Sequence, residues 1–133
     1  MSCFWDTLIK KINTNDIKTI LKITNIDPKT FSNALKNENI KTNNVLWKGG
    51  DLSEKQSISE KQKTENFDHI KEYDINTIKN GYLCSTFDPF LILICELFNI
   101  DIHHKYNGHM IIYEYQKQSK YQINIENNSG HMW

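Results

Sequence analysis

Residues 85–99 read STFDPFLILICELFN, and this stretch decides the fold of the chain. Asp88 is an N-cap residue and Pro89 suits the first helical position, so a helix is predicted from Pro89 onward. The body is apolar on nearly every side, which indicates a helix buried among other elements. Its longest apolar run, residues 90–98, is interrupted by Glu96 and is too short to span a bilayer. The rest of the chain must therefore supply the layers that cover this helix.

On the C-terminal side the hydrophobic period changes from helical to alternating. Residues 100–104 (IDIHH), 109–115 (HMIIYEY) and 121–125 (YQINI) are rich in Ile and Tyr and are separated by turn residues. They predict strands, joined as a small meander, and GHMW at 130–133 predicts the start of a last strand. We expect a small antiparallel or mixed β-sheet here.

The N-terminal side predicts helices. Residues 4–12 place their apolar side chains at helical spacing, with lysines on the opposite side. A second helix is expected to be capped by Asp16, and a third by Asp27 with Pro28 at its first position. The chain is thus predicted to be α+β, with N-terminal helices packed on a C-terminal sheet.

The middle of the chain is less regular. NNVLWKGGD, residues 43–51, predicts a turn-rich connection, and residues 51–66 are polar enough to predict a partly helical, poorly ordered insertion. Residues 69–81 predict a short helix ended by Gly81. Because neither half has enough apolar residues for a core of its own, we expect a single domain over residues 1–133.

Composition limits the classes of function. Sixteen acidic and sixteen basic residues give zero net charge, which argues against binding to nucleic acid or to an anionic membrane. All basic residues are lysine and there is one alanine, as expected of translation from an AT-rich genome. Three cysteines without metal-type spacing, and no segment resembling a signal peptide, predict a reduced, cytoplasmic protein. We expect a monomer without a cofactor.

Two residues near the termini are candidates for nucleophilic catalysis. Cys3 begins the first predicted helix, where the helix dipole and unpaired N–H groups favour a thiolate. His131 lies in NNSGHMW, where small residues precede it and hydrophobic ones follow, so its ring can reach a cleft. A cysteine and a histidine far apart in sequence can form a dyad in the fold. The alternative is that Cys3 packs beside Phe4 and Trp5 and that His131 is a solvated surface residue.

Other residues allow weaker hypotheses. His103 or His104 could join His109 across the YNG turn to bind a transition metal, although no cysteine or carboxylate has matching spacing. Trp47, followed by Gly49 and Gly50, could line a groove for an extended peptide or could be a core residue before a turn.

Taken in order, several motifs resemble those of OTU-like cysteine proteases. They are CFW at the start of a helix, GYLCSTFDPFLILICELFNIDI, the hairpin segment HMIIYEY, and SGHMW. The resemblance implies a papain-like fold and removal of ubiquitin from proteins, with Cys3 as nucleophile and His131 as general base. The chain is similar to family members encoded by large DNA viruses, and this similarity implies a place in the cytoplasm of the host cell.

The chain also departs from the family pattern. The family has an acidic residue and a glycine-containing loop before its cysteine, whereas here Met1 and Ser2 precede Cys3, as in a member shortened at both ends. Where the family commonly has Asp or Asn, two residues after its histidine, this chain has Trp133, whose indole cannot accept a hydrogen bond. Asp6, one turn beyond the cysteine, is a candidate for orienting His131.

Two functions are therefore expected from the resemblance. One is hydrolysis of isopeptide or peptide bonds in conjugates of ubiquitin or a ubiquitin-like protein by Cys3 and His131, with Trp47 and Trp133 contacting the substrate. The other is a catalytically inactive OTU-like module that binds ubiquitin or a host protein.

Overall fold

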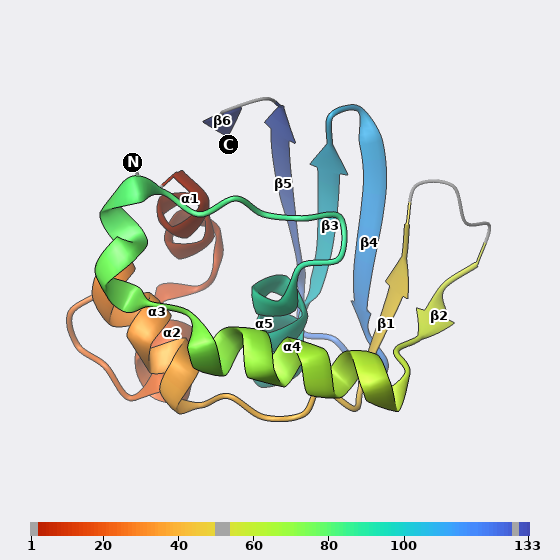
Figure 1. Cartoon of the computed structure of the whole chain (residues 1–133), viewed down its shortest axis with the longest axis horizontal. Coiled ribbons are helices and arrows are strands. Elements are labelled where there is room, and N and C mark those ends of the chain that lie inside the picture. The colour runs from red at the N-terminus through yellow and green to blue at the C-terminus, as the bar shows by residue number, and fades with distance from the viewer. Residues whose placement is uncertain (1–2, 50–53, 129–130) are drawn as a thin grey trace.

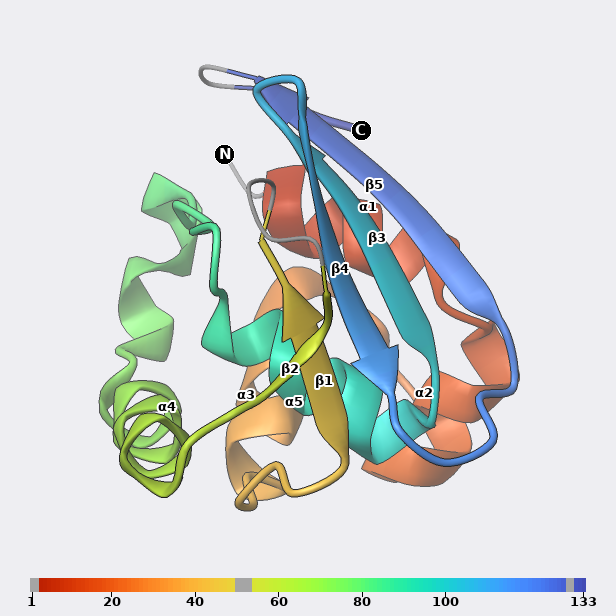
Figure 2. The same cartoon turned by 90° about the vertical axis from the view of Figure 1, so that its right-hand side faces the viewer.

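A layer of helices covers one face of a mixed β-sheet (Figures 1 and 2). The computed structural model describes residues 3–49, 54–128 and 131–133. The helices in these ranges are α1 (Cys3–Lys11), α2 (Thr14–Leu21), α3 (Pro28–Asn37), α4 (Glu60–Glu72), the 3₁₀ helix η1 (Ile75–Asn80) and α5 (Pro89–Phe98). The strands are β1 (Val45–Lys48), β2 (Gln56–Ser57), β3 (Asp101–Tyr106), β4 (His109–Tyr115), β5 (Gln122–Asn128) and β6 (His131–Met132). Their order in the sheet is β2-β1-β4-β3-β5-β6, so the predicted α+β class with a mixed sheet is confirmed.

Helix α5 is the centre of the core, as its sequence predicts. The Asp88 side chain accepts hydrogen bonds from the backbone N–H groups of Phe90 and Leu91, and Pro89 occupies the first turn. Seven of its ten residues are buried. The helix contacts β1, β3 and β4 on one side and α2, α3 and α4 on the other. Among the described residues, no helix has the length and apolarity that crossing a membrane requires.

The predicted meander is wrong, because β5 lies beside β3 and runs parallel to it rather than following β4. The connection after β4 crosses the start of β3 and is tied there by Asp101 (Figure 2). The Asp101 carboxylate accepts from the Tyr115 N–H at 2.8 Å and from the Ser119 hydroxyl at 3.2 Å. The Asp101 N–H in turn donates to the Tyr121 carbonyl, which leads the chain into β5 on the far side of β3. The β3–β4 turn at Asn107 and Gly108 is as predicted, and both residues have positive φ.

The stretch predicted as a turn-rich connection contains strand β1. Its four residues pair with β4, with Val45 opposite Tyr115 and Lys48 opposite Ile112. Gly49 follows because a Cβ there would lie 2.8 Å from Cη2 of Trp47. Gly50 lies outside the described residues.

The polar segment 51–66 is partly helical, as predicted, but its boundaries differ. Residues 51–53 lie outside the described part of the chain, β2 pairs with β1, and α4 begins at Glu60 behind the N-cap Ser59. Helix α4 runs on to Glu72, so the helix predicted to start at residue 69 is in fact the end of α4 followed by η1. Gly81 ends η1 with φ 88°, as predicted.

Helix α2 is capped by a residue that the sequence analysis did not choose. Asn13, not Asp16, is the N-cap, and its side chain accepts from the Asp16 N–H at 3.0 Å. The Asp16 carboxylate instead accepts from the Tyr121 hydroxyl, which joins α2 to the segment before β5.

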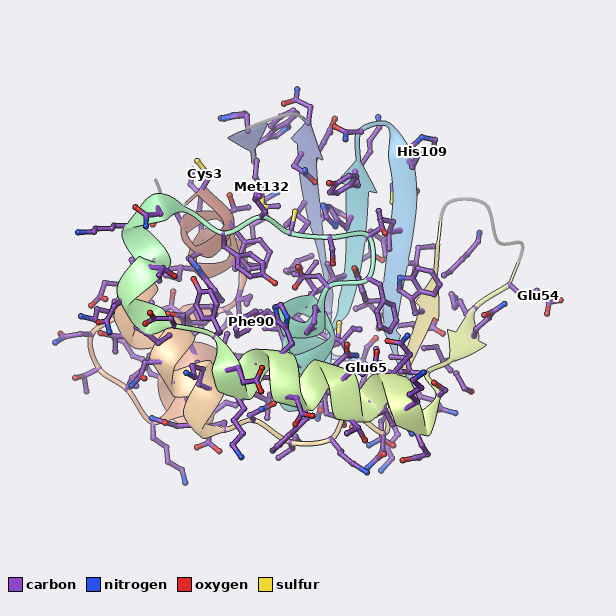
Figure 3. All side chains as sticks on the ribbon, in the orientation of Figure 1. Cys3, Glu54, Glu65, Phe90, His109 and Met132 are labelled. Carbon is purple, nitrogen blue, oxygen red and sulfur yellow. The ribbon has the colours of Figure 1, made fainter. Side chains whose placement is uncertain are left out.

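One continuous apolar cluster extends from Phe4 on α1 to Met132 on β6. Its aromatic part surrounds Trp5, which is fully buried. The Trp5 ring lies 4.9 Å from that of Phe4 and 4.9 Å from that of Phe90, both edge to face, a favoured arrangement. Figure 3 shows Phe90 inside the molecule, with Cys3 and Met132 together at one end. The apolar core thus brings the two ends of the described chain to the same place.

Candidate functional site

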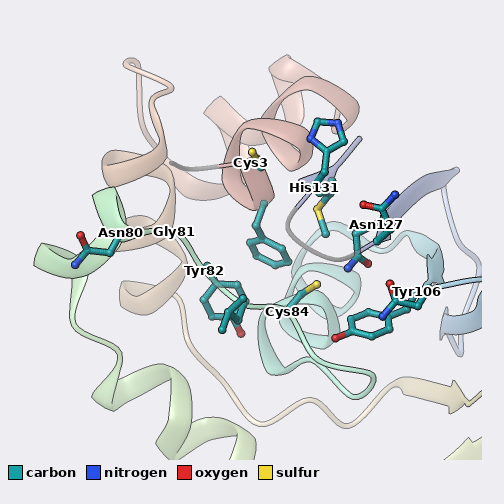
Figure 4. A pocket seen from close by; sticks show the side chains of 13 residues that line it. Cys3, Asn80, Gly81, Tyr82, Cys84, Tyr106, Asn127 and His131 are labelled. Carbon is teal, nitrogen blue, oxygen red and sulfur yellow. The ribbon is translucent and has the colours of Figure 1, made fainter.

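A pocket of about 340 Å³ opens where α1 begins, beside the ends of β3, β5 and β6. Its wall on the other side is the segment from Asn80 to Cys84, which crosses in front of the sheet (Figures 1 and 4). Polar groups on this lining include the amides of Asn127 and Asn128. The pocket is the strongest candidate site because it contains the residues that the sequence analysis selected for chemistry.

Cys3 and His131 both line this pocket. Cys3 is the first residue of α1 and is half-buried, and His131 is the exposed first residue of β6. Figure 4 shows both among the side chains that line the pocket. A thiol and an imidazole that line one pocket are the groups needed for nucleophilic attack assisted by a general base.

The aromatic residues after Cys3 explain how the first turn of α1 is held in place. Phe4 lines the pocket and packs on Tyr82 with ring centroids 4.5 Å apart, whereas Trp5 is buried against Phe90 of α5. Two large side chains in the first turn fix the position of the Cys3 backbone. Their role as core residues was one of the alternatives from the sequence, and it is compatible with Cys3 facing the pocket.

The other two cysteines are poor nucleophiles. Burial and the nearby Asp88 carboxylate raise the pKa of Cys84, which also lines the pocket, to about 12. Burial raises the pKa of the Cys95 thiol well above its ordinary value. Since the thiolate is the reactive form, both side chains remain unreactive thiols near neutral pH.

Asp88 has a second role that the sequence did not reveal. One carboxylate oxygen caps α5, and the other accepts from the Tyr82 hydroxyl at 2.9 Å and from the Ser85 N–H at 3.1 Å. Complete burial raises the pKa of Asp88 to about 6, and these hydrogen bonds oppose the rise. The Asp88 N–H donates to the Tyr113 hydroxyl of β4. Asp88 therefore ties the pocket wall to both α5 and the sheet.

His131 has two neighbours on its own sheet edge. The Trp133 ring is stacked on the imidazole with centroids 5.2 Å apart. Asn128 of β5 is the cross-strand partner of His131, and Asn127 pairs with Met132. Trp133, predicted as a substrate contact, is thus beside the candidate base and is 45% exposed.

Trp47 and Asp6 are not brought to this pocket. Trp47 lines a separate hollow of about 400 Å³ together with Phe87, and its indole N–H donates to the Thr86 carbonyl at 3.0 Å. Asp6 is exposed in the first turn of α1 and is not among the described residues that line the pocket. Trp47 therefore lines a hollow other than the one that contains Cys3 and His131, and the role of Asp6 in orienting His131 stays a prediction.

Of the histidines considered as metal ligands, the adjacent His103 and His104 lie on opposite faces of β3. His104 is fully buried, its Nε2 is hydrogen-bonded to Oδ1 of Asn127, and its burial lowers its pKa. His109 is exposed and lies opposite Tyr106 in the β3–β4 register (Figure 3). Within residues 3–49, 54–128 and 131–133, no group of three metal-ligating side chains occurs. The His104–Asn127 pair was not predicted; alternation with buried Ile102 was the signal that His104 faces inward.

Comparison of the chain with protein-family models, curated proteins and solved structures finds no match.

Proposed function

We propose that the protein is an OTU-like, papain-like cysteine protease that cleaves isopeptide or peptide bonds formed by the C-terminus of ubiquitin or a ubiquitin-like protein. The observation that carries the proposal is that Cys3 and His131 line one pocket. The motif resemblance selects the reaction class, and the three free cysteines agree with work in a reducing compartment such as the cytoplasm.

The chemistry follows from the two side chains. His131 takes the proton of the Cys3 thiol, and the thiolate attacks the carbonyl carbon of the scissile bond. The tetrahedral intermediate collapses to a thioester as the imidazolium protonates the leaving amine. A water molecule, deprotonated by the neutral imidazole, then attacks the thioester and releases the carboxylate and the thiol. Each cycle consumes one water and leaves both side chains unchanged.

The pocket wall offers a contact for a protein substrate. Leu83 is 93% exposed although it is a large apolar residue, and it lines the pocket between Tyr82 and Cys84. Exposing a single leucine to solvent has a small free-energy cost, but a leucine beside a candidate nucleophile can bury apolar surface of a bound partner. We expect it to contact the substrate next to the scissile bond.

The test is labelling with ubiquitin that carries a thiol-reactive group at its C-terminus. Wild type and Cys84→Ala are expected to form a covalent adduct, Cys3→Ala none, and His131→Ala an adduct that forms at least about a hundredfold more slowly. Cys84→Ala is the matched control, because it removes the other thiol that lines the pocket. An adduct that persists in Cys3→Ala, or wild type that stays unlabelled while folded, would remove the proposal.

A second candidate is a non-catalytic module of the same family that binds ubiquitin. It is favoured by the stacking of Trp133 on the imidazole of His131, which covers one face of the ring and presents an exposed aromatic surface. Titration of labelled ubiquitin into wild type and Cys3→Ala separates the two. Equal saturable binding to both proteins without any adduct supports the module, and the absence of saturable binding excludes it.

A further inference from the structure

The hollow lined by Trp47 and Phe87 is separate from the pocket of the proposed protease reaction. Its volume of about 400 Å³ lies within the range of about 300–1,000 Å³ that is usual for sites of small ligands. It lies where β1 and β2 meet the start of α4, and β2 is the outermost strand of the sheet (Figure 1). The hollow is therefore at the edge of the sheet, and the described residues that line it do not include Cys3 or His131.

Trp47 is held in one position by three contacts. Its indole N–H donates to the Thr86 carbonyl at 3.0 Å, and the ring of Phe87 is perpendicular to the indole with centroids 5.1 Å apart. The six-membered ring of the indole lies against Gly49, where a Cβ would be 2.8 Å from Cη2. Because the indole N–H is already bonded, the ring offers a ligand its apolar surface and no donor. The two rings form the apolar part of the hollow.

The rest of the lining is mainly polar and neutral. Gln56 is the cross-strand partner of Trp47, so both side chains leave the sheet on the same face. Gln62 is in the first turn of α4, and the hydroxyl of Ser59, the N-cap of this helix, accepts from the Gln62 N–H at 3.2 Å. Within the described residues, the carboxamides of Gln56 and Gln62 have no hydrogen-bond partner in the protein. Their donors and acceptors are therefore available to a ligand.

No charged side chain is among the described residues that line the hollow. Two charged residues lie next to this lining in the sequence and are paired elsewhere: Lys55 with Glu114 at 2.8 Å, and Glu60 with Lys63 at 3.2 Å. A charged ligand would lose hydration here without gaining a partner of opposite charge. A wholly apolar ligand would cover the carboxamides and leave them unpaired. The ligand that fits is neutral, with an apolar face and several groups that both donate and accept hydrogen bonds.

We infer that this hollow binds a neutral sugar. The C–H groups on one face of a pyranose ring bury apolar surface against the indole of Trp47. The hydroxyl groups around the sugar ring each donate and accept, which matches the carboxamides of Gln56 and Gln62 and the neighbouring serine hydroxyls. Because the hollow is not the Cys3 pocket, this binding is separate from the proposed protease reaction and does not depend on it.

The test is an NMR titration of the full-length protein, followed at the indole N–H resonances of its three tryptophans. The probes are the methyl glycosides of glucose, galactose, mannose and N-acetylglucosamine. Methyl glucuronoside, which has the glucose ring with a carboxylate, is the matched charged probe. Wild type is compared with Gln62→Ala and with the control Gln118→Ala, which removes an exposed glutamine that is not among the described residues lining the hollow. An unshifted resonance of the buried Trp5 in each variant shows that the core is intact.

At least one neutral glycoside is expected to shift the Trp47 resonance saturably and to leave that of Trp5 unchanged. Gln62→Ala is expected to raise the Kd of this glycoside about fivefold through the loss of one hydrogen bond, and Gln118→Ala is expected to leave it unchanged. The glucuronoside is expected to bind at least about tenfold more weakly than the glucoside. The inference is overturned if no neutral glycoside shifts Trp47 in the folded protein, if Gln62→Ala binds as tightly as wild type, or if the glucuronoside binds as tightly as the glucoside. None of these results depends on whether ubiquitin labels Cys3.

Discussion

The buried carboxylate of Asp88 makes a quantitative prediction about pH and stability. Its pKa in the folded protein is about 6, against an ordinary value of 3.8. The folded state therefore binds more protons than the unfolded state between these two values, and the free energy of unfolding must fall as pH rises through this range. The difference between the two pKa values corresponds to about 3 kcal/mol lost between pH 4 and pH 7.

Asp88→Asn removes this titration. The amide oxygen can still cap α5 at Phe90 and Leu91, but the amide N–H₂ then faces the Ser85 N–H, so one donor loses its acceptor. That loss lowers the stability of the variant by about 1–3 kcal/mol at every pH. On top of this constant offset, the stability of Asp88→Asn relative to wild type is expected to rise by about 3 kcal/mol from pH 4 to pH 7. Subtracting the two curves cancels the titration of all groups that the proteins share.

The measurement is urea unfolding at several pH values, followed by tryptophan fluorescence, to which the buried Trp5 contributes. Asp27→Asn is a suitable control, because Asp27 also caps a helix but is exposed, and hydrogen bonds from Thr30 lower its pKa. Its contribution is complete above pH 4, so the corresponding difference curve should be flat from pH 5 to pH 7. A flat curve for Asp88→Asn as well, or one that falls with pH, would refute the assignment of a buried, costly charge at Asp88.

Three further changes test other parts of the fold. Gly108→Ala is expected to cost about 1 kcal/mol in urea unfolding, because the turn needs φ +85° and nothing lies near the added Cβ, so only backbone strain is introduced. Burial lowers the pKa of His104, so below its ordinary value of 6.5 the wild-type histidine takes up a proton on unfolding and the melting temperature falls as the pH falls. His104→Gln removes this proton uptake and should reduce the loss of melting temperature between pH 7 and pH 5. An unchanged loss would show that His104 titrates normally. Gly49→Ala should displace the indole of Trp47, costing about 1–3 kcal/mol and shifting its emission, since the new Cβ would lie 2.8 Å from the ring.

The parts of the fold that follow from the sequence are those set by neighbouring residues. Helices α3 and α5 start where Asp27 and Asp88, each followed by proline, predict them, because a cap and a first-turn proline act within four residues. Strand β1 was missed because four residues are too few for a recognisable period and its partner β4 is far along the chain. The parallel pairing of β5 with β3 comes with contacts of the Asp101 side chain to Tyr115 and Ser119, which the local sequence pattern does not show.

In the candidate site, too, some residues were found from local sequence and others only from the tertiary structure. Cys3 and His131 were chosen from local motifs, and their presence at one pocket follows only from the packing of α1 beside β6. The role of Asp88 at the pocket wall depends on its tertiary contacts with Tyr82, Ser85 and Tyr113. In its local sequence Asp88 does not differ from an ordinary helix cap.

The position of His131 on a two-residue strand at the sheet edge has a consequence for dynamics. Strand β6 is attached by its ladder to β5 and by the buried side chain of Met132, whereas Cys3 is anchored through Trp5 to the centre of the core. A short edge element can detach at a far smaller free energy than global unfolding requires. Hydrogen exchange should therefore be much faster at the Met132 and Trp133 amides than in α5. Under the proposed function, the fraction of reactive molecules would then follow this local opening rather than the melting temperature.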